Sequence, residues 1–111
     1  DTEYDIIFSS GALHFMQRAG REGLCDSLKA HTADNGINAL NVFVEKPFIK
    51  RAPDSTREEE ELHPWHSGEL FGYYYDWMFH VCREDIFDCN SGGIPHKHCM
   101  DTLIARKIKN E

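Results

Sequence analysis

The stretch that decides the fold is residues 4–15, which reads YDIIFSSGALHF. Its first half is a continuous apolar run with β-branched and aromatic residues, which is typical of a strand covered on both faces in a parallel sheet. The small residues Ser9, Ser10 and Gly11 then end the strand. No glycine-rich nucleotide loop precedes it, so we expect a strand from the middle of an α/β fold.

The chain after this strand predicts a helix and a second parallel strand. Between residues 18 and 32, Leu24, Leu28 and His31 recur at helical spacing with charges between them. Asn35-Gly36 is expected to stop this helix. Residues 37–44 have strand composition, and a helix between two strands favours a parallel crossover connection.

The C-terminal part predicts a short helix and an antiparallel hairpin. Ser67 is the expected N-cap of a helix that runs to about Tyr74. Residues 77–87 and 96–108 are expected strands, and residues 88–93 form the turn between them. Residues 50–67 are expected to make a long, charged surface excursion.

Composition limits the class of protein. The chain has 111 residues, enough for one domain, and its 41% hydrophobic content is too high for a disordered chain. The net charge of −7 argues against nucleic acid and anionic membranes as partners. No apolar run reaches the ~20 residues that span a bilayer, so we expect a soluble, cytoplasmic protein. The four cysteines form no Cys-x-x-Cys pair and are expected to be reduced, partly buried thiols.

Three further strings carry a family resemblance. They are NALNVFV at 38–44, SGEL at 67–70 and LIARK at 103–107. With residues 4–15, they resemble the tellurite-resistance (TehB-like) branch of the class I S-adenosylmethionine-dependent methyltransferases, over nearly the whole chain. The resemblance implies an α/β fold, the second half of a Rossmann-like methyltransferase fold, with two parallel strands and a C-terminal antiparallel hairpin in a mixed sheet. We therefore expect residues 1–111 to form a single domain that corresponds to the C-terminal half of a methyltransferase domain.

The same resemblance implies methyl transfer from S-adenosylmethionine to a small-molecule acceptor, such as tellurite, selenite or a thiol. In that family the first half carries the glycine-rich loop and the acidic residue that binds the cofactor ribose, and neither is present here. The 111 residues alone are therefore expected to bind the cofactor poorly and to be inactive. Without the first half, residues 4–9 would be an exposed hydrophobic edge, through which a homodimer is expected.

The resemblance also implies roles for residues at the end of the first strand. Ser9, Ser10, Gly11 and Leu13 are implied cofactor contacts, since ligands bind at the carboxyl ends of strands in open α/β sheets. His14 would orient the acceptor or accept its proton. The alternative for His14 is that it only packs under the following helix.

A second group of candidates lies on the long loop. Trp65 and His66 would border the acceptor pocket in this resemblance, and an aromatic ring beside an imidazole suits a small polar substrate. The alternative is that this loop is a solvated surface turn.

The rival hypothesis is a standalone, non-catalytic binding module that holds a metal through histidines. His63 and His66 are close in sequence, and His96 and His98 share one face of the last predicted strand while Cys99 points to the other. Two histidines two residues apart could share a metal ion. Because no third ligand stands at a recognisable spacing, we assign no metal ligands from the sequence.

Overall fold

The structure is a computed structural model that describes residues 3–10, 18–49, 64–89 and 95–109. The elements in chain order are β1 (Tyr4–Ser9), α1 (Arg18–Ala30), β2 (Thr32–Val44), α3 (Glu69–Tyr73), β3 (Met78–Cys89) and β4 (His96–Arg106). The four strands form one sheet in the order β1-β2-β4-β3. β1 is parallel to β2, and β4 is antiparallel to both of its neighbours. The predicted α/β class, with two parallel strands and a C-terminal antiparallel hairpin, is confirmed.

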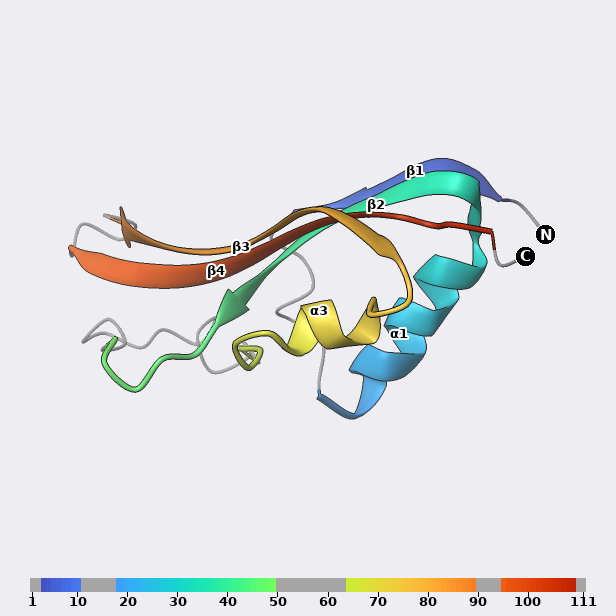
Figure 1. The fold of residues 1–111 in the computed structure, drawn as a ribbon. Helices are drawn as coiled ribbons and strands as arrows, with labels where there is room; N and C mark the ends of the chain where they lie inside the picture. Colours follow the sequence, from blue (N-terminus) through green and yellow to red (C-terminus); the bar gives the residue numbers. More distant parts are fainter. Residues whose placement is uncertain (1–2, 11–17, 50–63, 90–94, 110–111) are drawn as a thin grey trace.

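The two described helices lie on the same side of the sheet (Figure 1). Alternate residues of β2 and β4 face them and form the core with residues from the α3 region. The buried hydrophobic residues are Cys25, Leu40, Val42, Val44, Trp65, Leu70, Tyr74, Trp77, Cys99, Leu103 and Ala105. No helix in the described part of the chain has the length and apolar character that crossing a membrane requires.

β1 has the predicted bounds but not the predicted surroundings. It lies at one edge of the sheet, where Ile6 is 67% and Phe8 is 73% exposed. The expectation that both of its faces are covered is wrong for this chain, because the described helices cover only one face of the sheet.

The connection from α1 to β2 differs from the prediction that Asn35-Gly36 stops the helix. The helix ends at Ala30, and its last carbonyls are satisfied from elsewhere: the Thr32 hydroxyl donates to the Leu28 carbonyl at 2.7 Å, and Lys107 Nζ donates to the Lys29 carbonyl at 3.0 Å. Asn35 and Gly36 instead shape the start of β2.

Gly36 is required by a close approach of β1 to β2. A Cβ atom at this position would lie 2.9 Å from the Asp5 carbonyl oxygen and 2.8 Å from the Ala33 carbonyl oxygen. The pairing shifts here from Tyr4 opposite Thr32 to Ile6 opposite Ile37. Asn35 adopts a φ of 67° in this irregular stretch, a conformation that Asn tolerates better than most residues.

The start of α3 also differs from the prediction. Its N-cap is Gly68, with a φ of 80° and no side-chain cap, so the assignment of Ser67 as the N-cap is wrong. The Ser67 hydroxyl instead donates to Glu84 Oε2 at 2.6 Å. A contact between two segments has replaced a local cap.

The four cysteines are free, as expected for reduced thiols. Burial raises the pKa of Cys25 to about 12 and that of Cys99 to about 11. These two thiols are core groups. Cys82 is exposed and Cys89 is half-buried.

A buried guanidinium links the two helices. Arg21 of α1 is 1% exposed. Its Nη1 donates to both carboxylate oxygens of Glu69 in α3, at 2.9 and 3.1 Å, and its Nη2 donates to the Pro64 carbonyl at 3.3 Å. Its guanidinium carbon lies 4.6 Å from the centre of the Trp65 ring. Because a buried charge is costly unless it is paired, Glu69 is essential to this arrangement.

The Glu69 carboxylate accepts two further hydrogen bonds, from the His66 N–H and from the Tyr73 hydroxyl. Desolvation tends to raise its pKa, but hydrogen bonds from the His66 N–H, Arg21 and the Tyr73 hydroxyl outweigh it and keep the pKa below its usual value. The carboxylate therefore stays ionised beside the guanidinium.

We predict that Glu69→Gln lowers the free energy of unfolding by about 3 kcal/mol, because it leaves the Arg21 charge buried without a counter-ion. The double variant Arg21→Met/Glu69→Gln should recover part of this loss, since it removes the charge as well. Urea unfolding followed by circular dichroism measures both. Glu22→Gln, on the exposed face of α1, is the control and should change stability by less than about 0.5 kcal/mol. Equal losses for Glu69→Gln and Glu22→Gln would contradict the assignment.

Candidate functional site

The carboxyl ends of β1 and β2 lie side by side. Ser9, the last residue of β1, is opposite Leu40, and Asn41 Nδ2 donates to Ser10 Oγ at 3.1 Å. Ser9 and Ser10 therefore stand at the edge of the sheet where ligands bind in open α/β folds. The other predicted residues of this group, Gly11, Leu13 and His14, lie outside the described residues.

Trp65 occupies a different place from the one expected of a pocket-lining residue. Its side chain is 0% exposed. Its N–H donates to the Phe43 carbonyl at 2.8 Å and its carbonyl accepts from the Glu45 N–H at 3.0 Å, which forms a parallel bridge beside β2. This pairing turns the indole into the core, where Tyr73 packs against it edge-on at 6.0 Å. The ring thus has no exposed surface to offer a substrate.

His66, the next residue, is exposed. Its backbone N–H donates to Glu69 Oε1 at 3.0 Å. The main chain at His66 is therefore fixed, while its imidazole reaches solvent just beyond the bridge to β2. Of the two loop candidates, the structure places only His66 where a ligand can reach it.

The structure also brings together two carboxyl groups that the sequence analysis did not select. Asp101 of β4 is fully buried and lies opposite Glu84 of β3. The Gly68 N–H donates to Asp101 Oδ2 at 2.9 Å. The Ser67 hydroxyl donates to Glu84 Oε2 at 2.6 Å, and Lys46 Nζ pairs with Glu84 Oε1 at 2.6 Å.

The two carboxyl groups have opposite pKa shifts. Burial, together with the hydrogen bond to Glu84, raises the pKa of Asp101 to about 7. Hydrogen bonds from Asp101, Lys46 and Ser67 lower the pKa of Glu84 to about 2. The opposite shifts favour a single proton on the pair between about pH 2 and about pH 7, with Asp101 as the protonated member. The alternation of β4, whose residues Cys99 and Leu103 face the core, was the signal that could have revealed an inward Asp101.

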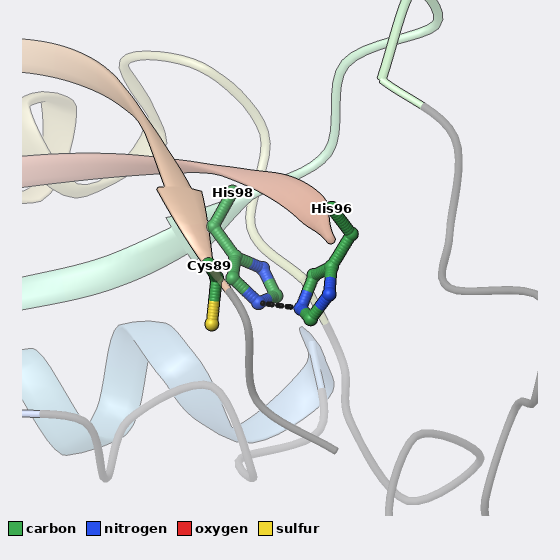
Figure 2. Close-up of side chains that lie close together, drawn as sticks. All are labelled: Cys89, His96 and His98. Carbon is green, nitrogen blue, oxygen red and sulfur yellow. Dashed lines mark hydrogen bonds between the residues drawn. The ribbon is translucent and has the colours of Figure 1, made fainter. Parts of the chain in front are cut away.

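A second cluster lies at the tip of the hairpin (Figure 2). Cys89 is the last residue of β3 and stands directly opposite His96, the first residue of β4. The Nε2 atoms of His96 and His98 are 2.9 Å apart, and one ligand atom from each of the three residues lies within 4.8 Å of the others. The sequence analysis had placed Cys89 in the turn, so it found the two histidines without their third neighbour.

We predict that the Asp101 proton makes the protein less stable as the pH rises. The unfolded chain loses this proton near the ordinary pKa of 3.8, whereas the folded chain holds it to about 7. The folded state then binds more protons in this interval, so the free energy of unfolding falls between about pH 4 and about pH 7. Glu84 has the opposite effect on the free energy of unfolding, because its pKa is lowered in the folded state. Its stabilising contribution is lost as the pH falls below the ordinary pKa of 4.5 toward about 2.

Asp101→Asn tests this prediction, because an amide can accept from the Gly68 N–H and donate to Glu84 without titrating. Urea unfolding over the interval from about pH 4.5 to about pH 7.5 should show a flatter profile for this variant than for the wild type. Asp88→Asn, an exposed Asp on the neighbouring strand β3, is the control and should keep the wild-type decline. Parallel profiles for wild type and Asp101→Asn would refute the shared proton.

Comparisons with known proteins complete the description of the fold. No protein-family model and no curated protein matches the sequence. Solved structures do match, with 15 matching chains, two of which are as follows. TehB from Haemophilus influenzae covers 96% of this chain with a TM-score of 0.77 and 24% sequence identity. A chain from the structural study of the conversion of a disulfide bond into a thioacetal group during echinomycin biosynthesis covers 97%, with a TM-score of 0.62 and 10% identity.

The present chain spans 36% of the TehB chain and 50% of the second one. At these identities the likeness concerns the fold. The predicted resemblance in fold is confirmed: this chain folds like part of a TehB-like methyltransferase.

Proposed function

We propose that this chain forms the acceptor-side part of an S-adenosylmethionine-dependent methyltransferase that modifies a small acceptor. The observation that carries the proposal is the match to TehB over 96% of the chain, with a TM-score of 0.77. One fold can host many functions, so the chemistry must also rest on the groups at the carboxyl ends of β1 and β2. Those groups are consistent with such a site.

The described residues fit the cofactor in part. Ser9 and Ser10 present hydroxyl groups at the carboxyl end of β1, and Asn41 orients Ser10. This is the sheet edge where polar atoms of a nucleoside cofactor bind in open α/β folds. The glycine-rich loop of the family pattern is absent from these 111 residues. We therefore assign Ser9, Ser10, Gly11 and Leu13 to one wall of the cofactor site and expect the other wall to come from further chain.

Methyl transfer depends mainly on how the acceptor is positioned relative to the cofactor. When bound, the cofactor supplies a methyl group on a sulfonium, which an acceptor attacks from behind. The chain's own part is to hold that acceptor in line and to exclude water. We assign the orientation of the acceptor, and acceptance of its proton where it has one, to His14, together with the exposed His66.

The acceptor is assigned to a class of small nucleophiles. The family resemblance favours tellurite, selenite or a thiol. The net charge of −7 disfavours a polyanionic acceptor such as nucleic acid.

We predict that S-adenosylhomocysteine binds the complete gene product that contains this chain and does not bind the 111 residues alone, because one wall of the site is missing from them. Calorimetric titration of both proteins measures this. In the complete protein, Ser10→Ala should weaken binding by about fivefold, the value of one hydrogen bond of about 1 kcal/mol.

Ser27→Ala is the matched control, since Ser27 is an exposed serine on α1, and it should leave the affinity unchanged. Transfer of a labelled methyl group to selenite, tellurite or a small thiol then identifies the acceptor. A complete protein that binds no S-adenosylhomocysteine would overturn the proposed function.

We also propose that β1 pairs with a second chain. Among the described elements β1 has one neighbour, β2, and its other edge is open. Tyr4, Ile6 and Phe8 are exposed along this strand. An apolar strand edge of this kind favours association, because it offers both unpaired backbone groups and apolar surface.

Sedimentation equilibrium of the 111-residue chain should therefore show a dimer at high protein concentration. Phe8→Lys should shift the chain to the monomer, since a charge on an edge strand opposes edge-to-edge pairing. Tyr75→Lys is the control, because Tyr75 is similarly exposed, at 81%, but lies after α3. A wild-type chain that stays monomeric would contradict the proposed pairing.

A further inference from the structure

We infer that Cys89, His96 and His98 form a binding site for a borderline-soft divalent metal ion of the zinc type. The three side chains come from the two strands of the β3–β4 hairpin, at its tip (Figure 2). One sulfur and two imidazoles offer ligand atoms that all lie within 4.8 Å of one another. The inference does not depend on methyl transfer.

Strand pairing brings the three ligands together. Cys89 and His96 are direct partners in the antiparallel register, and Phe87 is the partner of His98. Directly opposed residues have Cβ atoms about 4.5–5.5 Å apart, and residues two apart on a strand share a face. Since β3 and β4 are paired along their whole described length, the backbone holds this arrangement without the ion.

The distances suit a tetrahedral ion after small side-chain rotations. With metal–nitrogen bonds of about 2.0–2.1 Å and a metal–sulfur bond of about 2.3 Å, tetrahedral ligands are about 3.3 Å (N to N) and about 3.5 Å (S to N) apart. The two Nε2 atoms are 2.9 Å apart, joined by a hydrogen bond in which one ring donates to the other. An ion would take the place of the hydrogen between the two rings, and the ring that donates it would carry its proton on Nδ1 instead, so binding releases only the thiol proton of Cys89.

The surroundings fix the orientation of His98. Its ring stacks on Phe43, with the centroids 4.8 Å apart and the planes at 16°, and lies 5.9 Å from the ring of Phe87. Apolar neighbours of this kind limit the access of solvent to a metal centre and lower the dielectric around it. Cys89, His96 and His98 are each half-buried, so an ion can still reach them.

The ligand set selects the class of metal. A thiolate with two imidazoles suits zinc and its spectroscopic substitute cobalt(II), whereas calcium and magnesium prefer oxygen ligands. Three protein ligands leave a fourth position for water or another small ligand, as in catalytic rather than structural zinc sites. Asp88 and Lys97, which alternate with these residues, pair with each other at 2.8 Å on the opposite side of the hairpin.

The test is titration of cobalt(II) chloride into the metal-free, reduced 111-residue chain. We expect one equivalent to bind, with a thiolate-to-cobalt charge-transfer band in the near ultraviolet and with d–d bands of tetrahedral intensity, and zinc chloride should displace it. Cys89→Ser should abolish the charge-transfer band and weaken binding more than about tenfold, since even outer-shell changes at metal sites cost about 10–100-fold. His96→Asn should weaken binding similarly and keep the band.

Two controls separate this site from adventitious binding. Cys82→Ser removes an exposed thiol from the same strand, and His31→Ala removes an exposed imidazole from outside the hairpin. Both should bind cobalt as the wild type does. Circular dichroism of each metal-free variant establishes that it is folded. If Cys89→Ser does not fold, His96→Asn serves as the ligand variant. No stoichiometric binding, binding without the thiolate band, or equal losses for Cys82→Ser and Cys89→Ser would overturn the inference.

Discussion

The described structure depends on the buried ion pair between Arg21 and Glu69. The guanidinium of α1 would be very costly to bury alone, and the carboxylate of α3 makes its burial tolerable. The same guanidinium lies against Trp65 and donates from its Nη2 to the Pro64 carbonyl. One side chain thus fixes three things at once: the position of α1, the position of α3, and the bridge that joins the residues before α3 to β2.

This bridge has consequences for the shared proton. Because the segment from Trp65 into α3 is held in place, the Ser67 hydroxyl and the Gly68 N–H stand where Glu84 and Asp101 can use them. Gly68 has a left-handed conformation, with a φ of 80°, and its N–H donates to Asp101 Oδ2 at 2.9 Å. The carboxyl pair is therefore a product of tertiary packing rather than of the hairpin alone.

The helices and strands could be predicted from the sequence better than the contacts between residues that are distant along the chain, and particular residues explain this difference. The bounds of β1 and the pairing of the hairpin follow from apolar runs and turn residues that lie within or next to these elements in the sequence. The end of α1 depends on Lys107, which is far away in sequence. Ser67 was expected to cap a helix, and Glu84 on another element binds it instead. Trp65 has no local signal that distinguishes a core ring from one that lines a pocket.

Cys89 illustrates the same limit at the candidate metal site. The turn residues after it predicted an earlier end for β3, and a shift of two residues in that end removes Cys89 from the strand face that carries His96 and His98. Register decides which side chains meet across a hairpin, and register depends on the exact length of the turn. A pattern that gives strand ends to within a few residues can identify the two histidines and still miss the cysteine.

The two faces of the sheet follow from strict alternation along β4. Cys99 and Asp101 point toward the helices, whereas His96 and His98 point to the other face. That second face also carries Ile6 and Phe8 of β1, which no described element covers. Parallel strands are normally covered on both faces, and this chain spans 36% of the TehB chain whose fold it shares. The apolar residues of β1 therefore have the composition of a covered strand, which supports the proposed association of this strand with a second chain.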